Sequence, residues 1–146
     1  MTKIKSKLTN HLIFNGKKET SEKIIRKNFK TLQKKSFKCS NKLFQLAIIS
    51  SMSVFRLHQI SLKNRKKKKV HEIPGFLHNQ NNRISLTLKF LLKAIKQKLK
   101  SPHFDKNFST EILLLSKFES ENLSIKNELQ KNIVTKKHLF RYYRWH

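Results

Sequence analysis

The sequence predicts a mainly α-helical fold: a single domain over residues 1–146, with about six helices and a β-hairpin between the third and fourth. Ile, Leu and Phe recur at helical spacing over most of the chain, which indicates amphipathic helices. That spacing disappears between Arg56 and Asn82, where apolar stretches flank a run of lysines. An apolar content of 37%, with eleven Phe, is too high for a disordered chain and sufficient for one helical core.

The helices are expected at about residues 3–15, 21–35, 41–55, 83–100, 105–118 and 124–143. In the first, Ile4, Leu8 and Leu12 share one face. Asn15-Gly16 then favours the left-handed backbone that ends a helix. The second helix would be capped by Thr20, and its apolar stripe consists of Ile24, Ile25, Phe29 and Leu32.

Ser40 and Asn41 would cap the third helix. Its apolar residues are so closely spaced that we expect it to be the most buried helix; they are Leu43, Phe44, Leu46, Ala47, Ile48 and Val54. The last three helices each have an apolar face as well, and Pro102 would stop the fourth. Their apolar positions include Ile84, Leu88, Leu91, Leu92, Ile95, Leu99, Phe108, Ile112, Leu115, Ile125, Leu129, Ile133 and Phe140.

The hairpin is expected at about residues 57–79. The stretch from Leu57 to Leu62 and the stretch from Val70 to Phe76 are compatible with two short strands. The basic run Arg65–Lys69 would form the connecting tip, although no Asn-Gly or Asp-Gly turn accompanies it.

The charge of the chain points to a polyanionic partner. Thirty-four Lys and Arg against eight Asp and Glu give a formal net charge of +26. Each phosphate that a cation neutralises releases a condensed counterion, so nucleic acid is the natural partner. Lysine outnumbers arginine 28 to 6, which favours phosphate contacts over bidentate base contacts.

Other classes of protein fit the sequence poorly. No apolar run approaches the length of a membrane span, and the N-terminal residues are expected to form structure and no transit peptide. The single cysteine, Cys39, excludes an internal disulfide and is expected to be half-buried and inert.

Residues for chemistry are also missing, so we expect no enzyme, no catalytic residue, no metal and no cofactor. The eight carboxylates are scattered, and the four between Glu111 and Glu128 are assigned to solvated helix ends. His58, His71 and His78 lack companions for a zinc site and are expected at the surface.

Three basic places are candidate RNA-binding sites. The first is Lys17 and Lys18, with Lys3, Lys5 and Lys7 aligned on one side of the first helix; the alternative is a solvated helix end. The second is Lys63, Arg65, Lys66, Lys67, Lys68 and Lys69, with a surface decoration or localisation signal as the alternative. The third is the C-terminal set Lys136, Lys137, Arg141, Tyr142, Tyr143, Arg144 and Trp145, where rings can stack on bases. Its alternative is that Phe140 and one tyrosine dock the last helix on the core, and Arg83 completes the candidates.

Two end motifs resemble one known family. The segment Leu8-Thr-Asn-His-Leu-Ile-Phe-Asn-Gly-Lys-Lys18 is similar to the first helix and Asp/Asn-Gly-Lys-Lys turn of small-subunit ribosomal protein seven, of the bacterial and organellar type. The closing Phe140-Arg-Tyr-Tyr-Arg-Trp145 is similar to that family's Phe-x-His-Tyr-Arg-Trp, and Ile73-Pro74 matches its Val/Ile-Pro step. The chain departs from the family in three places: Lys67 and Lys68 replace tip glycines, Phe90 is nearest to the fourth-helix tryptophan, and little of the basic arm precedes the first helix.

The resemblance implies a structural protein that binds the 3′ domain of small-subunit rRNA and organises the ribosomal head, with the hairpin near the exit-site tRNA and mRNA path. It implies other head proteins as neighbours and no homo-oligomer. Abundant Lys, Asn, Ile and Phe with few Gly and Pro is typical of an AT-rich genome, so a mitochondrion is the first choice, ahead of a plastid-type organelle or a bacterium. The alternatives are a histone-like DNA-binding protein of an organelle nucleoid and a protein scaffold.

Overall fold

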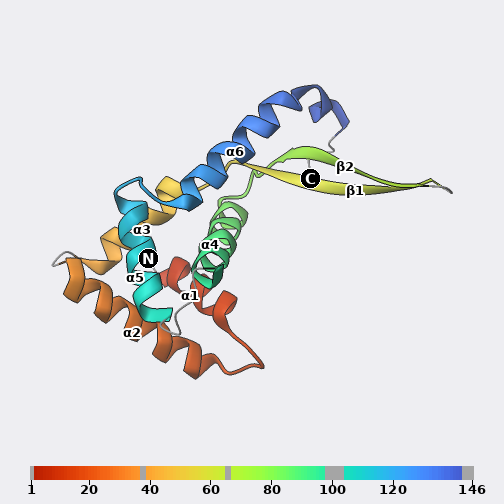
Figure 1. The fold of residues 1–146 in the computed structure, drawn as a ribbon. Helices are drawn as coiled ribbons and strands as arrows, with labels where there is room; N and C mark the ends of the chain where they lie inside the picture. Colours follow the sequence, from red (N-terminus) through yellow and green to blue (C-terminus); the bar gives the residue numbers. More distant parts are fainter. Residues whose placement is uncertain (1, 37–38, 65–66, 98–103, 143–146) are drawn as a thin grey trace.

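The computed structural model describes residues 2–36, 39–64, 67–97 and 104–142. Within these ranges the chain forms six α-helices, one 3-10 helix and one two-stranded hairpin between α3 and α4, so the predicted fold class is confirmed. Figure 1 shows the hairpin extending away from the helices, beyond α4 and α6. The elements are α1 (Thr2–Leu12), α2 (Lys18–Ser36), α3 (Ser40–Ser51), β1 (Phe55–Asn64), β2 (Lys67–Phe76), α4 (Gln80–Gln97), α5 (Phe104–Ser116), α6 (Glu121–Thr135) and η1 (Lys137–Tyr142).

The core is built around three phenylalanines from three helices. Phe29 of α2 meets Phe44 of α3 edge to face with ring centroids 5.3 Å apart, and Phe108 of α5 lies 6.3 Å from both. Such contacts add to the free energy gained from burying the rings. Fully buried aliphatic residues surround them, including Leu8, Leu32, Ile48, Leu88, Ile95, Ile112 and Leu115.

The corner between α1 and α2 confirms the predicted left-handed turn. Asn15 has φ 50° and Gly16 has φ 73°, a region that glycine and asparagine tolerate best. The start of α2 differs from the prediction because the Thr20 hydroxyl donates to the Lys17 carbonyl and does not cap the helix. The helix therefore begins at Lys18, and Ile24 of the expected stripe is 42% exposed.

The third helix is shorter than expected, and two of its apolar side chains are exposed. Its N-cap is Cys39, whose side chain makes no capping bond, and Ser40 is already helical. It ends at Ser51 because Met52 turns to extended backbone at ψ 124°. Leu46 and Ile49 are 44% and 70% exposed, while Phe44, Ala47 and Ile48 are buried as expected. The buried residues of α4 are Ile84, Thr87, Leu88, Leu91, Leu92, Ala94 and Ile95.

The two strands of the hairpin are longer than predicted, and the first begins at Phe55, which was assigned to the third helix. Its antiparallel register runs from Phe55 opposite Phe76 to Asn64 opposite Lys67. Val54 and Phe55 favour extended structure, and the Phe55 ring packs on Phe76 with centroids 5.9 Å apart. Pro74 fits within β2 because a two-stranded ribbon leaves one edge of each strand unpaired.

Polar side chains determine where α4 and α6 begin. The Asn79 side chain accepts the backbone N–H of Asn81, which caps α4 and starts it at Gln80, three residues before the predicted Arg83. Ser120 accepts the N–H of Asn122 in the same way, so α6 begins at Glu121 and precedes the predicted Ser124. The end expected for the fourth helix, at residues 98–102, lies outside the described residues.

Two ends differ from the sequence prediction. Phe118 adopts a left-handed φ of 63°, so α5 ends at Ser116 and the ring is 66% exposed. The sixth helix stops at Thr135, where Lys136 forms the C-cap, and η1 continues as a separate element. The expected single helix over residues 124–143 is therefore two pieces.

Glu111 does not lie at a solvated helix end. Its carboxylate is fully buried, accepts a hydrogen bond from the Ser120 hydroxyl, and accepts a second from Asn122 Nδ2 at 2.8 Å. Because Ser120 also caps α6, the carboxylate fixes the corner between α5 and α6. A buried charge is tolerated only when it is paired or hydrogen-bonded in this way.

Candidate RNA-binding surface

Two lysines of α1 contact different neighbouring helices, one α2 and the other α4. Lys5 places its ammonium 4.7 Å from the centre of the Phe29 ring, whereas Lys7 donates to the Asn81 backbone carbonyl at 2.8 Å. These residues lie two positions apart on a helix, so they point in nearly opposite directions. The expectation that Lys3, Lys5 and Lys7 align on one side is therefore wrong for Lys5 and Lys7.

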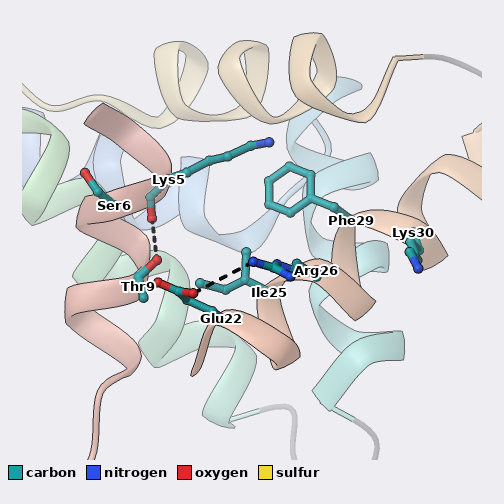
Figure 2. A pocket seen from close by; sticks show the side chains of 8 residues that line it. All are labelled: Lys5, Ser6, Thr9, Glu22, Ile25, Arg26, Phe29 and Lys30. Carbon is teal, nitrogen blue, oxygen red and sulfur yellow. Dashed lines mark hydrogen bonds and ion pairs between the residues drawn. The ribbon is translucent and has the colours of Figure 1, made fainter. Parts of the chain in front are cut away.

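The Lys5 side opens on a pocket between α1 and α2. Figure 2 shows Lys5 reaching over Phe29, with Glu22 and Arg26 paired on the α2 side. The pocket floor is Ile25 and Phe29. Because Glu22 lines it together with the cations, the pocket has mixed charge and is a weaker phosphate site than its lysines alone indicate.

Lys17 and Lys18 are exposed on the corner between α1 and α2. Lys17 N–H bonds to the Phe14 carbonyl within this turn. Lys18 lies 4.0 Å from Glu22, a long and exposed pair that holds neither side chain firmly. Both ammonium groups are therefore accessible to a polyanion.

The lysine run belongs to the strands more than to a tip. Lys63 lies near the end of β1, and Lys67, Lys68 and Lys69 are the first three residues of β2. Arg65 and Lys66 lie outside the described residues. The ribbon thus brings Lys63 opposite Lys68 and carries positive charge away from the helices.

The base of the hairpin is held by two of the candidate cations. Arg83 donates from Nε to the Leu77 carbonyl at 2.6 Å and stacks its guanidinium 5.2 Å from the centre of the Phe76 ring. Lys136 lies 2.6 Å from the Glu72 carboxylate, and the hydrogen bond from Lys136 lowers the pKa of Glu72. Both cations therefore orient the hairpin in the free protein.

The C-terminal candidates follow the same base. Phe140 packs against Phe55 of β1 with ring centroids 5.9 Å apart, so its ring docks this segment on the base of the hairpin. Lys137 is exposed, and Arg141 and Tyr142 end η1. Tyr143, Arg144 and Trp145 lie outside the described residues.

A basic groove that was not predicted from the sequence runs along α4. Lys89, Lys93 and Lys96 are exposed and share one helix face, because they are spaced four and three residues apart. With His11 of α1 they line what we call the α4 groove, about 450 Å³ in volume, together with Leu92 and Gln97. The lysine spacing was visible in the sequence, but its pairing with His11 needs the packing of α1 on α4.

A second groove adjoins the first at Lys89. This hairpin-base groove is lined by Arg56, Leu77, Asn82, Ser85, Leu86 and Lys89. Arg56 comes from β1 and the others come from α4 or the segment before it. Since Lys89 lines both grooves, positive charge continues from the foot of the hairpin along α4.

Histidines in these regions are less basic than usual. Burial, followed by the charges of Lys89 and Lys7, lowers the pKa of His11. Burial and Arg56 lower the pKa of His58, while His78 is exposed. In the described part of the chain no group of three His, Cys, Asp or Glu residues could hold a metal ion.

Cys39 is exposed, which corrects the expectation of a half-buried residue. The backbone N–H groups of Lys42 and Asn41, at the start of α3, lower the pKa of its thiol. No helix in the described ranges is both apolar and long enough to cross a membrane.

The arrangement can bind polyanions through accessible ammonium groups on a rigid helical frame. The family model for ribosomal protein S7p/S5e matches residues 1–137, which is nearly the whole chain. No curated protein gives a match to the chain. The helices, the inserted hairpin and this match agree, and the chain belongs to the ribosomal protein S7p/S5e family, whose members are structural, rRNA-binding constituents of the small ribosomal subunit.

Proposed function

We propose that this protein binds the 3′ domain of small-subunit rRNA and organises the head of the small subunit during assembly. The observation that carries the proposal is the continuous basic surface from the hairpin base along α4, joined at Lys89. A surface of this kind tracks a sugar-phosphate backbone. The family supports small-subunit rRNA as the partner, and the choice of its 3′ domain is part of the proposal.

The mechanism is charge neutralisation by a pre-arranged frame, with no reaction catalysed. Lys17 and Lys18 hold backbone at the corner between α1 and α2, where both are exposed. The ribbon with Lys63 and Lys67–Lys69 enters a groove of the folded rRNA and lies near the exit-site tRNA and mRNA path. The segment with Arg141, Tyr142, Tyr143, Arg144 and Trp145 anchors the C-terminus to RNA and to neighbouring head proteins.

The proposed location is a mitochondrial small ribosomal subunit. The support is compositional: 28 Lys against 6 Arg and only two Gly in 146 residues is typical of an AT-rich genome. A plastid-type organelle and an AT-rich bacterium are the other sources of such a composition. We propose that the protein binds as one copy per particle and forms no homo-oligomer.

Sedimentation of a cell or organelle lysate tests the proposal. The protein should co-sediment with small subunits at physiological salt and be released by RNase and not by DNase. Release by DNase, or absence from the small-subunit fraction, would favour the histone-like alternative and overturn the proposal. A density map of the intact particle then places the chain in the head or elsewhere.

A further inference from the structure

We propose that the α4 groove binds successive phosphates of an RNA strand and that His11 takes up a proton when a phosphate enters. This deepens the proposed function, on which it rests. It assigns a ligand chemistry and a proton-linked response to a site that the family match does not describe.

The groove combines an apolar floor with cations on its walls. Leu92 is 6% exposed and forms the floor, while Lys89, Lys93 and Lys96 are exposed and line the groove with His11. Lys89 and Lys96 are seven residues apart, a rise of about 10 Å along the helix axis. That span covers more than one phosphate of a nucleic-acid strand, so one strand can meet successive ammonium groups.

Charge composition separates this groove from the pocket between α1 and α2. Among the described residues that line the α4 groove or the hairpin-base groove there is no carboxylate. The pocket between α1 and α2 contains Glu22. A phosphate therefore meets only attraction in the α4 groove, and the groove is the better anion site.

His11 is placed so that an anion changes its protonation. The charged groups facing it are Lys7 on its own helix and Lys89, Lys93 and Lys96 on α4. Burial and the nearby lysines lower its pKa in the free protein, so the imidazole is neutral at neutral pH. A bound phosphate supplies the opposite charge, which favours the imidazolium form. Binding then consumes a proton, and affinity for RNA must rise as the pH falls.

The probe for the test is a fluorescent fragment of the rRNA 3′ domain, with a scrambled RNA of equal length as its control. Affinity of the full chain is measured from about pH 7.5 to about pH 5.5 at fixed salt. Relative to His11→Gln, the unaltered chain should gain an additional factor of roughly threefold to tenfold over this interval, because one unit of pKa change is worth tenfold. His11→Lys should bind at pH 7.5 as tightly as the unaltered chain does at pH 5.5.

His78→Gln is the matched control, because His78 is exposed and lines neither groove. It should keep the full pH response. Proton NMR of His11 supplies a second readout that does not depend on a variant: its pKa should rise when the rRNA fragment is added.

The two proposals fail differently. Equal pH responses of the unaltered chain and His11→Gln, or an unchanged pKa of His11 in the complex, would overturn the role of His11 while leaving rRNA binding intact. Equal affinity for the rRNA fragment and the scrambled RNA, with a normal His11 response, would overturn the proposed function and leave the phosphate groove. Absence of RNA binding at every pH would overturn both.

Discussion

The Lys136 ammonium lies 2.6 Å from the Glu72 carboxylate and ties the segment after α6 to the second strand of the hairpin. Phe140 packs on Phe55 in the same region, so an ion pair and a ring contact hold the two parts together. The sequence placed Lys136 among the candidate RNA-binding residues, whereas the fold pairs it with a carboxylate. The charge available at the hairpin base is thus set partly by Glu72.

Replacing Glu72 with Gln should separate these two roles of Lys136. Folding stability should change little, because the pair is partly exposed. If Lys136 is then free for a phosphate, rRNA affinity should rise and the salt slope should steepen by about 0.9. Titrations at several salt concentrations measure both, and an unchanged slope would make Lys136 a structural latch only.

The Lys136–Glu72 pair also predicts how folding stability depends on pH in the acid range. The hydrogen bond from Lys136 lowers the pKa of Glu72, so the folded state holds its proton less tightly than the unfolded chain. The stabilisation is therefore present above the ordinary glutamate pKa of about 4.3 and is lost as the pH falls below it. Urea unfolding at several pH values should show this loss in the unaltered chain and not in Lys136→Met.

Glu111→Ala should be among the more damaging single substitutions. It leaves the Ser120 hydroxyl and the Asn122 amide without their buried acceptor and opens a cavity, at a cost of roughly 2–4 kcal/mol. The midpoint of urea unfolding measures the loss. Glu128→Gln, on the exposed side of α6, should stay within about 0.5 kcal/mol of the unaltered protein; an equal loss in both variants would contradict the role of Glu111.

Gly16→Ala should cost about 1 kcal/mol through the backbone alone. Its φ of 73° is unfavourable for alanine, yet a Cβ at this position would meet no atom within 4 Å. Gly16→Asn should cost less, because asparagine tolerates the left-handed region. Thermal unfolding of the two variants gives the comparison, and equal losses would point to an unexpected contact.

Replacing Lys66, Lys67, Lys68 and Lys69 with serine should leave the helical circular dichroism intact and weaken rRNA binding. The salt slope should fall by about 0.9 for every phosphate that these lysines neutralise in the complex. Titrations of the rRNA fragment at several salt concentrations measure the slope. Loss of the helical signal would instead show that the hairpin lysines are needed for folding. An unchanged salt slope would show that these lysines contact no phosphate.

A parallel series on α4 tests the groove itself. Lys89→Gln, Lys93→Gln and Lys96→Gln should each weaken rRNA binding and lower the salt slope by about 0.9 with little change in stability, because all three are exposed. Lys34→Gln on α2 makes the same change of charge away from the groove. A loss as large in Lys34→Gln as in the α4 variants would mean that only net charge matters.

Apolar periodicity carried most of the fold prediction. Positions such as Leu8, Phe108 and Ile133 were assigned to buried faces and are buried, because helical spacing alone brings them to one side. The boundaries were less predictable because several polar residues compete to cap each helix. Asn79 and Ser120 are the residues that cap α4 and α6, although neighbouring Asn and Ser residues could have done so. Which residue caps a helix depends on the tertiary structure around it.

Contacts between residues far apart in the chain could not be predicted from the sequence. Glu111 meets partners nine and eleven residues away, and Lys7 meets Asn81 across 74 positions, so periodicity contains no signal for either. Helix geometry alone could have shown that Lys5 and Lys7 point in opposite directions. The helical spacing of Lys89, Lys93 and Lys96 could also have been read from the sequence. His11 entered the site only because α1 packs on α4.

The ribbon also has a consequence for the protein before it reaches RNA. Two strands standing away from the helices leave backbone edges open, and open edges invite pairing with another chain. β2 begins with three lysines, and like charges on two free chains would oppose such pairing. The lysines proposed to hold RNA would therefore also oppose pairing between free chains, until phosphates neutralise them.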